Sequence, residues 1–285
     1  MIGRSRARAA LSALLLVASG AVAGPVLDPE RSLSPTVPAR LTEAVGTAAR
    51  QRPVLALVID DLGWNAPAGE RVLALPAPIT VAVLPGTPSG SRLAEAAARR
   101  GHEIILHQPM EALSASSPGP GALDSAQAPA VIRRRLAANL EEIPHLVGVS
   151  NHMGSRLTAE PGAMRTVMEE LGPRALYFLD SRTTPDSVAF QTARAHAIPT
   201  TRRDVFLDTV IDAAHIDRAL TAAVELAERR GHALAIGHPH PETLRILEAR
   251  MAELRARVEL VKVSQLIEMH QPRAKPRSAN RLATD

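Results

Sequence analysis

Short apolar runs alternate with amphipathic helical patterns along most of the chain. The runs suited to β-strands are residues 54–59, 79–84, 103–107, 146–150, 175–179, 233–237 and 258–263. Helical patterns lie between them, near residues 67–75, 88–100, 129–142, 160–171, 187–196, 213–230 and 241–256. Apolar strands joined through helices are typical of a parallel sheet covered by helices. About seven such units predict an α/β fold with a closed or nearly closed barrel, and a doubly wound open sheet is the alternative.

The two ends of the chain differ from this repeating middle. Residues 1–23 combine three arginines, a short apolar stretch and a small-x-small motif ending at Ala23, which is typical of a cleavable export signal. Residues 24–51 are proline-rich and predict a flexible linker, and residues 269–285 predict a basic disordered tail. We therefore expect one domain at residues 52–268, periplasmic or secreted, cut near Ala23 and without a stable membrane span afterwards. An uncleaved membrane anchor is the alternative.

Composition narrows the classes of function. The chain has no cysteine, so any metal must be held by His, Asp or Glu. The formal net charge is +4, and the three arginines of the leader supply most of it, so the charge is not the footprint of a nucleic-acid-binding protein. Aromatic residues make up only 2% of the chain, which disfavours long glycan grooves and single-stranded nucleic-acid platforms, because both use stacked rings.

Polar residues follow nearly every predicted strand at its carboxyl end. In parallel β/α folds these ends meet at one face, where functional sites form. The residues are Asp60, Asp61, His107, Glu111, Asn151, His152, Asp180, Arg182, Arg203, Asp208 and His238. Each alone has an ordinary explanation, such as a helix cap, a core histidine or an ion pair. Their convergence at one end of the fold predicts a functional site.

One carboxylate and two imidazoles suit a mononuclear divalent metal, and Zn²⁺ accepts this set as a catalytic site. Asp61, His107 and His152 are the candidate ligands. Asp60 lies next to Asp61, but adjacent residues of a strand point in different directions. The pair therefore predicts a division of labour, with Asp61 on the metal and Asp60 as general base.

Other residues of the set complete this chemistry. His238 would protonate the leaving group, and Arg182 or Arg203 would orient a carboxylate and adjust the pKa of the base. The chain lacks G-x-S-x-G, H-E-x-x-H, G-x-x-x-x-G-K-[ST] and G-x-G-x-x-G, so serine hydrolase, zincin, P-loop and Rossmann mechanisms are disfavoured.

Several motifs resemble a known family. "VIDDLG", "GHEIILHQPME" and "AIGHP" are similar to motifs of the NodB-type polysaccharide deacetylases. Together with "GVSNHMGSR", "FLDSRTTP" and "RRDVFLD", the set more closely resembles the YibQ-like group, the divergent polysaccharide deacetylases. The resemblance spans about residues 52–268. It implies a distorted (β/α) barrel of about seven parallel strands, a divalent metal, most often zinc, and removal of N- or O-acetyl groups from a sugar.

The resemblance also implies roles for single residues. Asp60 matches the base, Asp61 and His107 match metal ligands, and His238 matches the catalytic acid. The family's second metal-binding His is replaced by Glu111, so either His152 or Glu111 completes the site. The residues expected to contact the substrate or support the ligands are Asn151, Asp180, Arg182, Arg203 and Asp208.

The leading hypothesis is a metal-dependent carbohydrate deacetylase whose substrate is an acetylated envelope glycan or its fragments, with no nucleic-acid partner. The alternative is a non-catalytic envelope protein that binds metal or glycan through a degenerate site. A third hypothesis is a hydrolase of a non-sugar amide, or an iron enzyme that uses two histidines and one carboxylate.

Overall fold

The computed structural model describes residues 52–270 of the 285-residue chain. The predicted export signal, the linker and all but the first two residues of the predicted tail lie outside this range. Residues 269 and 270, predicted as tail, form the end of a helix instead. Among residues 52–270, no helix has both the length and the apolar character needed to cross a bilayer.

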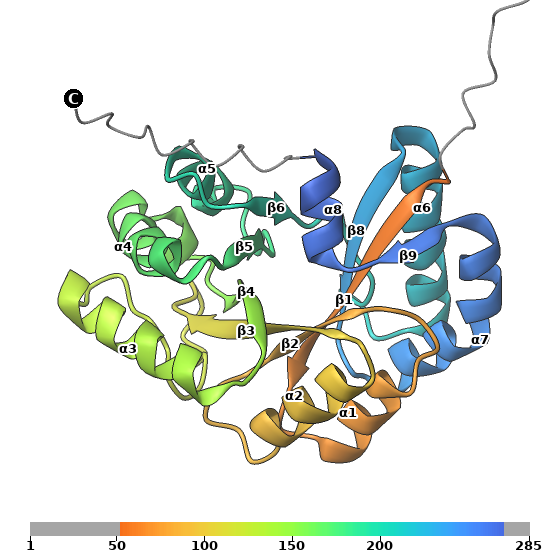
Figure 1. The fold of residues 1–285 in the computed structure, drawn as a ribbon, viewed down its shortest axis with the longest axis horizontal. Helices are drawn as coiled ribbons and strands as arrows, with labels where there is room; N and C mark the ends of the chain where they lie inside the picture. Colours follow the sequence, from red (N-terminus) through yellow and green to blue (C-terminus); the bar gives the residue numbers. More distant parts are fainter. Residues whose placement is uncertain (1–51, 271–285) are drawn as a thin grey trace, which may run out of the picture. The chain divides into compact units, whose positions relative to one another are not determined.

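The described residues form one parallel sheet with helices around it (Figure 1). The strands are β1 (Val54–Leu62), β2 (Thr80–Val83), β3 (Glu103–Met110), β4 (Leu146–Met153), β5 (Tyr177–Asp180), β6 (Thr200–Arg202), β7 (Val205–Phe206), β8 (His232–Gly237) and β9 (Glu259–Val261). The α-helices are α1 (Ala66–Leu73), α2 (Gly90–Arg99), α3 (Pro129–Glu142), α4 (Pro161–Leu171), α5 (Ala189–Ala195), α6 (Ala213–Arg230), α7 (Pro241–Arg257) and α8 (Val263–His270). Two short 3₁₀ helices are η1 (Leu157–Ala159) and η2 (Gly172–Arg174).

The order of the strands confirms a distorted parallel barrel. The sheet runs β6-β5-β4-β3-β2-β1-β8-β7, and β9 pairs with β1. Residues 200–206 link the two edges, because β6 pairs with β5 and β7 pairs with β8. The amide N–H of Arg203 donates to the carbonyl of Asp180, and that of Asp204 donates to Leu234 on the other edge. One short stretch of chain therefore bridges the opening of a curved, partly open barrel.

The strand count differs from the expected seven. Residues 52–270 contain nine strands, and the two additional ones are β6 and β7, which have three and two residues and lie in the polar stretch after α5. The run at residues 258–263 is only partly a strand, since β9 ends at Val261 and α8 begins at Val263. Strands as short as β6 and β7 show too little periodicity to be recognised in the sequence.

Two apolar cores lie on the two faces of the sheet. The outer core packs the strands against the surrounding helices, and the inner core fills the bore of the barrel. Alternate residues of β1 belong to different cores, Leu55, Leu57 and Ile59 to the outer one and Val54, Ala56 and Val58 to the inner one. This two-residue alternation decides which polar residues at the strand ends face the bore.

Helix α8 fills the amino end of the bore. It lies within the curve of the sheet in Figure 1, and Val263, Leu266 and Ile267 pack into the inner core. The backbone N–H groups at its start need acceptors. Val263 donates to Oγ1 of Thr80 at 3.1 Å, and Ser264 donates to Oε1 of the buried Glu103 at 3.2 Å.

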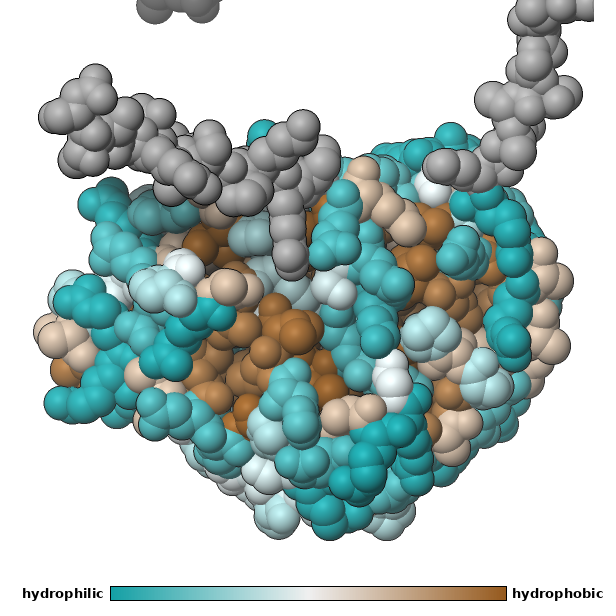
Figure 2. All heavy atoms as spheres, viewed as in Figure 1, coloured by the Kyte–Doolittle hydropathy of each residue, from teal (hydrophilic) through white to brown (hydrophobic). Residues whose placement is uncertain are grey.

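A hollow lies beside α8. It has a volume of about 620 Å³ and is lined mainly by the amino ends of β4, β5 and β6 and by α8. In the view of Figure 2, apolar residues gather in the middle of the drawn face and hydrophilic ones surround them. None of the polar residues singled out in the sequence lines this hollow. The polar cluster described next lies at the opposite ends of the strands.

Candidate active site

A bulge at the end of β1 brings Asp60 and Asp61 to the same place. Between Ile59 and Leu62, β1 advances three residues while its partner β2 advances two, so β1 contains one extra residue. Asp61 adopts a left-handed conformation, with φ of 60°, which costs an aspartate less than most other residues. Strand alternation alone would point only Asp60 into the bore. The bulge turns Asp61 inward as well, so the expectation that the two side chains diverge is wrong.

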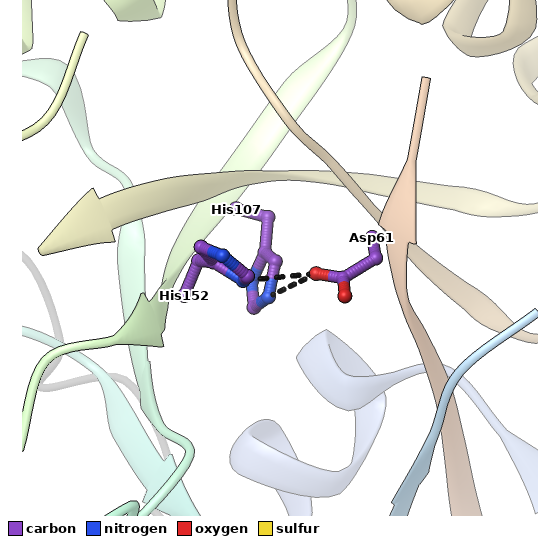
Figure 3. A group of neighbouring side chains, drawn as sticks. All are labelled: Asp61, His107 and His152. Atoms are coloured by element: carbon purple, nitrogen blue, oxygen red, sulfur yellow. Dashed lines mark ion pairs between the residues drawn. The ribbon is translucent and has the colours of Figure 1, made fainter. Parts of the chain in front are cut away.

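His107 and His152 approach the carboxylate of Asp61 from β3 and β4 (Figure 3). Nε2 of His107 lies 3.2 Å from Oδ1 of Asp61, and Nδ1 of His152 lies 2.9 Å from the same oxygen. Nε2 of His107 is also 3.5 Å from Oδ2 of Asp60. The other ring nitrogen of His107 is hydrogen-bonded to Oγ of Ser150 at 2.8 Å, which fixes the orientation of the imidazole.

The donor atoms of this cluster fit a divalent metal. Oδ1 of Asp61 is buried and has no hydrogen-bond partner, although two imidazole nitrogens are close to it. The two imidazole nitrogens therefore lie near the oxygen without forming hydrogen bonds to it. Ligand atoms around one metal ion are arranged in the same way, because each points at the ion and not at the other ligands. Two ligands of a tetrahedral zinc ion lie about 3.3 Å apart when each bond is about 2.0–2.1 Å. The observed separations match this spacing, and the metal role of the three residues stays a prediction.

The two aspartates differ in their acidity. Burial alone would raise the pKa of Asp61, but the adjacent imidazoles of His107 and His152 outweigh it and hold the pKa well below its usual range. Burial raises the pKa of Asp60, and the charges of His107 and His238 only partly oppose this. Asp60 is 1% exposed, and its Oδ1 has no hydrogen-bond partner. Asp61 is thus the stronger acid of the pair and Asp60 the better proton acceptor.

His238 faces the two aspartates from the end of β8. Its Nδ1 is 2.9 Å from Oδ1 of Asp208, and its Nε2 is 4.0 Å from Oδ2 of Asp61. Burial would lower the pKa of His238, but the hydrogen bond to Asp208 and the charge of Asp60 raise it to about 9. A protonated imidazole at neutral pH, with Nε2 toward the site, is suited to donate a proton.

Asp208 is held in place by its own set of hydrogen bonds. Its Oδ2 accepts the backbone N–H of His238 at 2.7 Å and the hydroxyl of Thr243 at 2.8 Å. Asp208, His238 and His240 also form a second group with metal-ligand spacing. The oxygens of Asp208 already accept three hydrogen bonds from the chain, so this group lacks the unpartnered oxygen of the first one.

Several other predicted residues support the site from outside the cluster. Asp180 points away from the bore and accepts the backbone N–H of Arg182 at 2.8 Å and the hydroxyl of Ser187 at 2.9 Å. Asn151 accepts the N–H of Ser181 at 2.9 Å and donates to Met153, so it ties the ends of β4 and β5 together. These contacts shape the loops and leave both side chains out of the metal-spaced group.

Arg203 supports the site through an aromatic ring. Its guanidinium donates to the carbonyls of Ser181 and Arg182, and its Cζ lies 4.2 Å from the centroid of Phe206. The Phe206 ring in turn is stacked on His238, with centroids 5.5 Å apart and an interplanar angle of 8°. Arg203 thus buttresses the proposed acid. Burial lowers the pKa of Arg203 and the charge of Asp60 is among those that oppose this, so the guanidinium also interacts electrostatically with the proposed base.

Glu111 does not join the cluster. Oε2 accepts hydrogen bonds from the backbone and hydroxyl of Ser125, and Oε1 pairs with Arg156 at 3.2 Å. The structure therefore brings His152, and not Glu111, to Asp61 and His107. Glu111 thereby holds the long loop at residues 111–128.

A cleft of about 360 Å³ opens beside the cluster. Asp61 and His152 line one part of it, and residues 117–120 of the long loop form another wall. The loop is tied down from beneath, because Gln108 and Asn139 both donate side-chain hydrogen bonds to the carbonyl of Gly121. The polar cluster therefore lies at the edge of a preformed cleft large enough for a small ligand.

Residues 57–267 match the family model described as divergent polysaccharide deacetylase. The chain belongs to this family. The uncharacterized protein YibQ of Escherichia coli K12 is 38% identical over 213 residues, which cover 75% of this chain and 67% of that protein. An uncharacterized protein of Haemophilus influenzae Rd is 34% identical over 212 residues, covering 74% and 76%. The crystal structure of uncharacterized protein ATU2773 from Agrobacterium tumefaciens C58 is similar at a TM-score of 0.73, with 30% identity, covering 75% of this chain and 89% of that one.

Three residues of this deacetylase-family site were not predicted from the sequence. They are Ser150, Thr243 and Phe206, which contact His107, Asp208 and His238. Ser150 had a usable signal, because it lies two residues before His152 and therefore faces the same side of β4. Thr243 and Phe206 had no such signal in the sequence. A threonine early in a helix and an apolar residue in a two-residue strand are common in proteins without any functional role.

Proposed function

We propose that this chain is a metal-dependent carbohydrate deacetylase that hydrolyses N- or O-acetyl groups on an envelope glycan or its fragments. The observation that carries the proposal is the buried, unpartnered oxygen of Asp61 with two imidazole nitrogens beside it. Membership of the divergent polysaccharide deacetylase family supports the class of reaction.

Asp61, His107 and His152 would hold the metal, and their oxygen and nitrogen donors suit zinc best. A divalent ion bound there would polarise the acetyl carbonyl and lower the pKa of an attacking water. The chain prepares this role in two ways. The pKa of Asp61 lies well below its usual range, so its carboxylate is ionised, and the hydrogen bond to Ser150 orients the ring of His107.

Asp60 would take the proton of the attacking water. Its Oδ1 makes no hydrogen bond, so it is available to accept one. Burial raises the pKa of this carboxyl, which makes its carboxylate a stronger base than an exposed aspartate. Asp60 lies beside Asp61, so the base would stand next to an acetyl carbonyl bound at the proposed metal site.

His238 would donate a proton to the departing amine or hydroxyl of the sugar. Its pKa of about 9 keeps the ring protonated at neutral pH, and Nδ1 is already used by Asp208, which leaves Nε2 to act. Arg203 and Phe206 hold the ring plane by stacking. The acid and the base are therefore separate groups with opposite charge states, as one hydrolysis step requires.

The proposal includes export of the protein. The leader predicted at residues 1–23 would direct the protein across the inner membrane into the periplasm, the compartment in which envelope glycans are found. The mass of the mature protein from a periplasmic extract tests this directly. Cleavage near Ala23 is expected, and recovery of an intact leader would contradict it.

The decisive experiment measures acetate released from acetylated sugar oligomers by the zinc-loaded protein. Asp60→Asn should lower the rate by at least ~10²–10⁴-fold while the zinc content stays at one per chain, because Asp60 is not a proposed ligand. Asp186→Asn is the matched control, since Asp186 is exposed and distant in sequence from the cluster, and it should retain full activity. Zinc-loaded protein that binds acetylated sugars but releases no acetate would favour the non-catalytic alternative.

A further inference from the structure

Trp64 is the one tryptophan of the chain, and its side chain is exposed to solvent in the wall of the active-site cleft. It is 57% exposed, although it follows the buried end of β1 by only two residues. Its indole makes no hydrogen bond, ring stack or cation contact with any other residue between 52 and 270. A large apolar ring left this exposed at a cleft indicates a ligand-binding surface more than a packing role.

The backbone around Trp64 is fixed. The carbonyl of Leu62 accepts the N–H of Leu84 at 2.9 Å, and that of Gly63 accepts the N–H of Ser89 at 3.1 Å. Gly63 has φ of 135°, and a Cβ there would lie 2.1 Å from Oγ1 of Thr87, so no other residue fits. Asn65 then caps α1 through a hydrogen bond from Ala68. The indole is therefore presented by a rigid turn, which lowers the entropy cost of using it in binding.

The cleft that contains Trp64 carries almost no charge. Its lining includes prolines 85, 109, 118 and 120, and Asp61 and His152 are the only ionisable side chains in it. No lysine or arginine lines it. In the metal-free protein a ligand held here meets apolar surface and a few hydrogen-bonding groups, and an anionic ligand would meet no lysine or arginine.

We infer that Trp64 is a sugar-binding platform, on which the apolar face of one uncharged, acetylated pyranose ring rests while its acetyl group lies at Asp61. This inference rests on the proposed function and specifies its substrate. A pyranose ring has a face of C–H groups and a rim of hydroxyls, which matches an indole face beside hydrogen-bonding groups. The 360 Å³ cleft lies near the lower end of the ~300–1,000 Å³ range of small-molecule sites, so it takes a short glycan fragment and not a long chain.

The single tryptophan makes the inference directly testable. The emission of the metal-free protein is recorded during titration with N-acetylglucosamine and its dimer and tetramer, and with acetylated xylose oligomers. A saturable change in emission is expected for at least one of these neutral sugars, with affinity that does not rise from dimer to tetramer. A glucuronic-acid-containing disaccharide should bind more weakly. Absence of any change with all the neutral sugars would overturn the inference, and so would affinity that keeps rising with chain length.

Variants separate the platform from the chemistry. Trp64→Ala should raise KM for acetate release by roughly 10-fold with kcat little changed, and Trp64→Tyr should restore much of the loss. Leu113→Ala is the matched control, because Leu113 is 63% exposed but does not line the cleft, and KM should stay as in the wild type. Unchanged KM in Trp64→Ala would reject the platform and leave the deacetylase proposal intact. Saturable sugar binding that depends on Trp64, without acetate release, would support the platform and contradict the deacetylase proposal.

Discussion

The bore of the barrel has buried carboxylates at both ends, and the two ends differ in how many hydrogen bonds the chain supplies to them. At the amino end, Oε1 of Glu103 accepts hydrogen bonds from Thr80 and Tyr177, both at 2.9 Å, and from the backbone of Ser264. At the carboxyl end, Oδ1 of both Asp60 and Asp61 has no hydrogen-bond partner. A buried acid whose hydrogen bonds the chain supplies stabilises the fold, whereas one with a buried oxygen that accepts no hydrogen bond is expected to meet a ligand.

A single strand connects these two environments. Glu103 and His107 lie four residues apart on β3 and face the bore, with Ile105 of the inner core between them. The helix that closes the amino end begins at the Glu103 network, while the carboxyl end keeps a cleft. Stability and function are thus separated along the axis of the barrel, and a substitution at one end should leave the other end unaffected.

The largest effect is expected from Asp61→Asn. Asparagine keeps the shape and tolerates the left-handed backbone, but it removes the negative charge that the metal would need. Calorimetric titration with zinc should show loss of stoichiometric binding. The thermal midpoint of the metal-free protein should fall as well at neutral pH, because the imidazoles of His107 and His152 stabilise the ionised carboxylate of Asp61 in the folded chain. Zinc affinity equal to that of Asp186→Asn would show that Asp61 is not a metal ligand.

Asp208→Asn tests whether Asp208 raises the pKa of His238, the proposed proton donor at the carboxyl end of the bore. Activity that needs protonated His238 falls as pH rises through the pKa of this histidine. The Asp208 carboxylate raises that pKa, so its removal should move the alkaline limb of the rate profile to lower pH. The fall in kcat at neutral pH should be smaller than the ~10²–10⁴-fold expected on losing the acid itself. The profile of kcat against pH measures both, and an alkaline limb at its wild-type position would remove His238 from the role of acid.

A smaller effect is expected from Ser150→Ala. The hydroxyl of Ser150 orients His107 through Nδ1, and loss of such a supporting hydrogen bond lowers metal affinity by roughly 10–100-fold. Competition with a zinc chelator measures the change. Ser155→Ala is the control, since its hydroxyl serves the backbone of Leu113 and no imidazole, and it should leave affinity unaltered. Equal affinities in the two variants would contradict the role of Ser150.

The sequence predicted the long elements well and the shortest ones poorly. The helical patterns at residues 129–142 and 213–230 coincide with α3 and α6, and Gly231 ends α6 with φ of 85°, as a C-cap glycine does. Helix α8 was missed because its apolar residues continue a strand-like run after β9. Its place inside the bore depends on Glu103, which is 161 positions earlier in the chain. Such long-range contacts leave no local periodicity.

The site was predictable where strand alternation holds and not where it fails. His107 shares the parity of the inner-core Ile105 on β3, and His238 continues the parity of the inner-core Ile236 on β8. On β4, His152 has the opposite parity to Val149, which belongs to the outer core, so the convergence of the three histidines follows from a two-residue period. Asp180 has the parity of Phe178, which belongs to the outer core, and this explains why it stays outside the cluster. Asp61 breaks the rule through a bulge, and no local motif marked the extra residue. Backbone irregularity thus lies at the residue with the sharpest proposed role.

The smallest expected effect belongs to the amino end, in Tyr177→Phe. The substitution removes one donor to Glu103 and leaves those from Thr80 and Ser264, so the carboxylate keeps partners. The free energy of unfolding should fall by about 1 kcal/mol, the usual value of one hydrogen bond, with little change in packing because the ring remains. Denaturant titration measures this change, and zinc affinity and acetate release should equal those of the wild type. If zinc affinity fell as well, the two ends of the bore would be coupled through β3, and their division into a structural end and a functional end would be wrong.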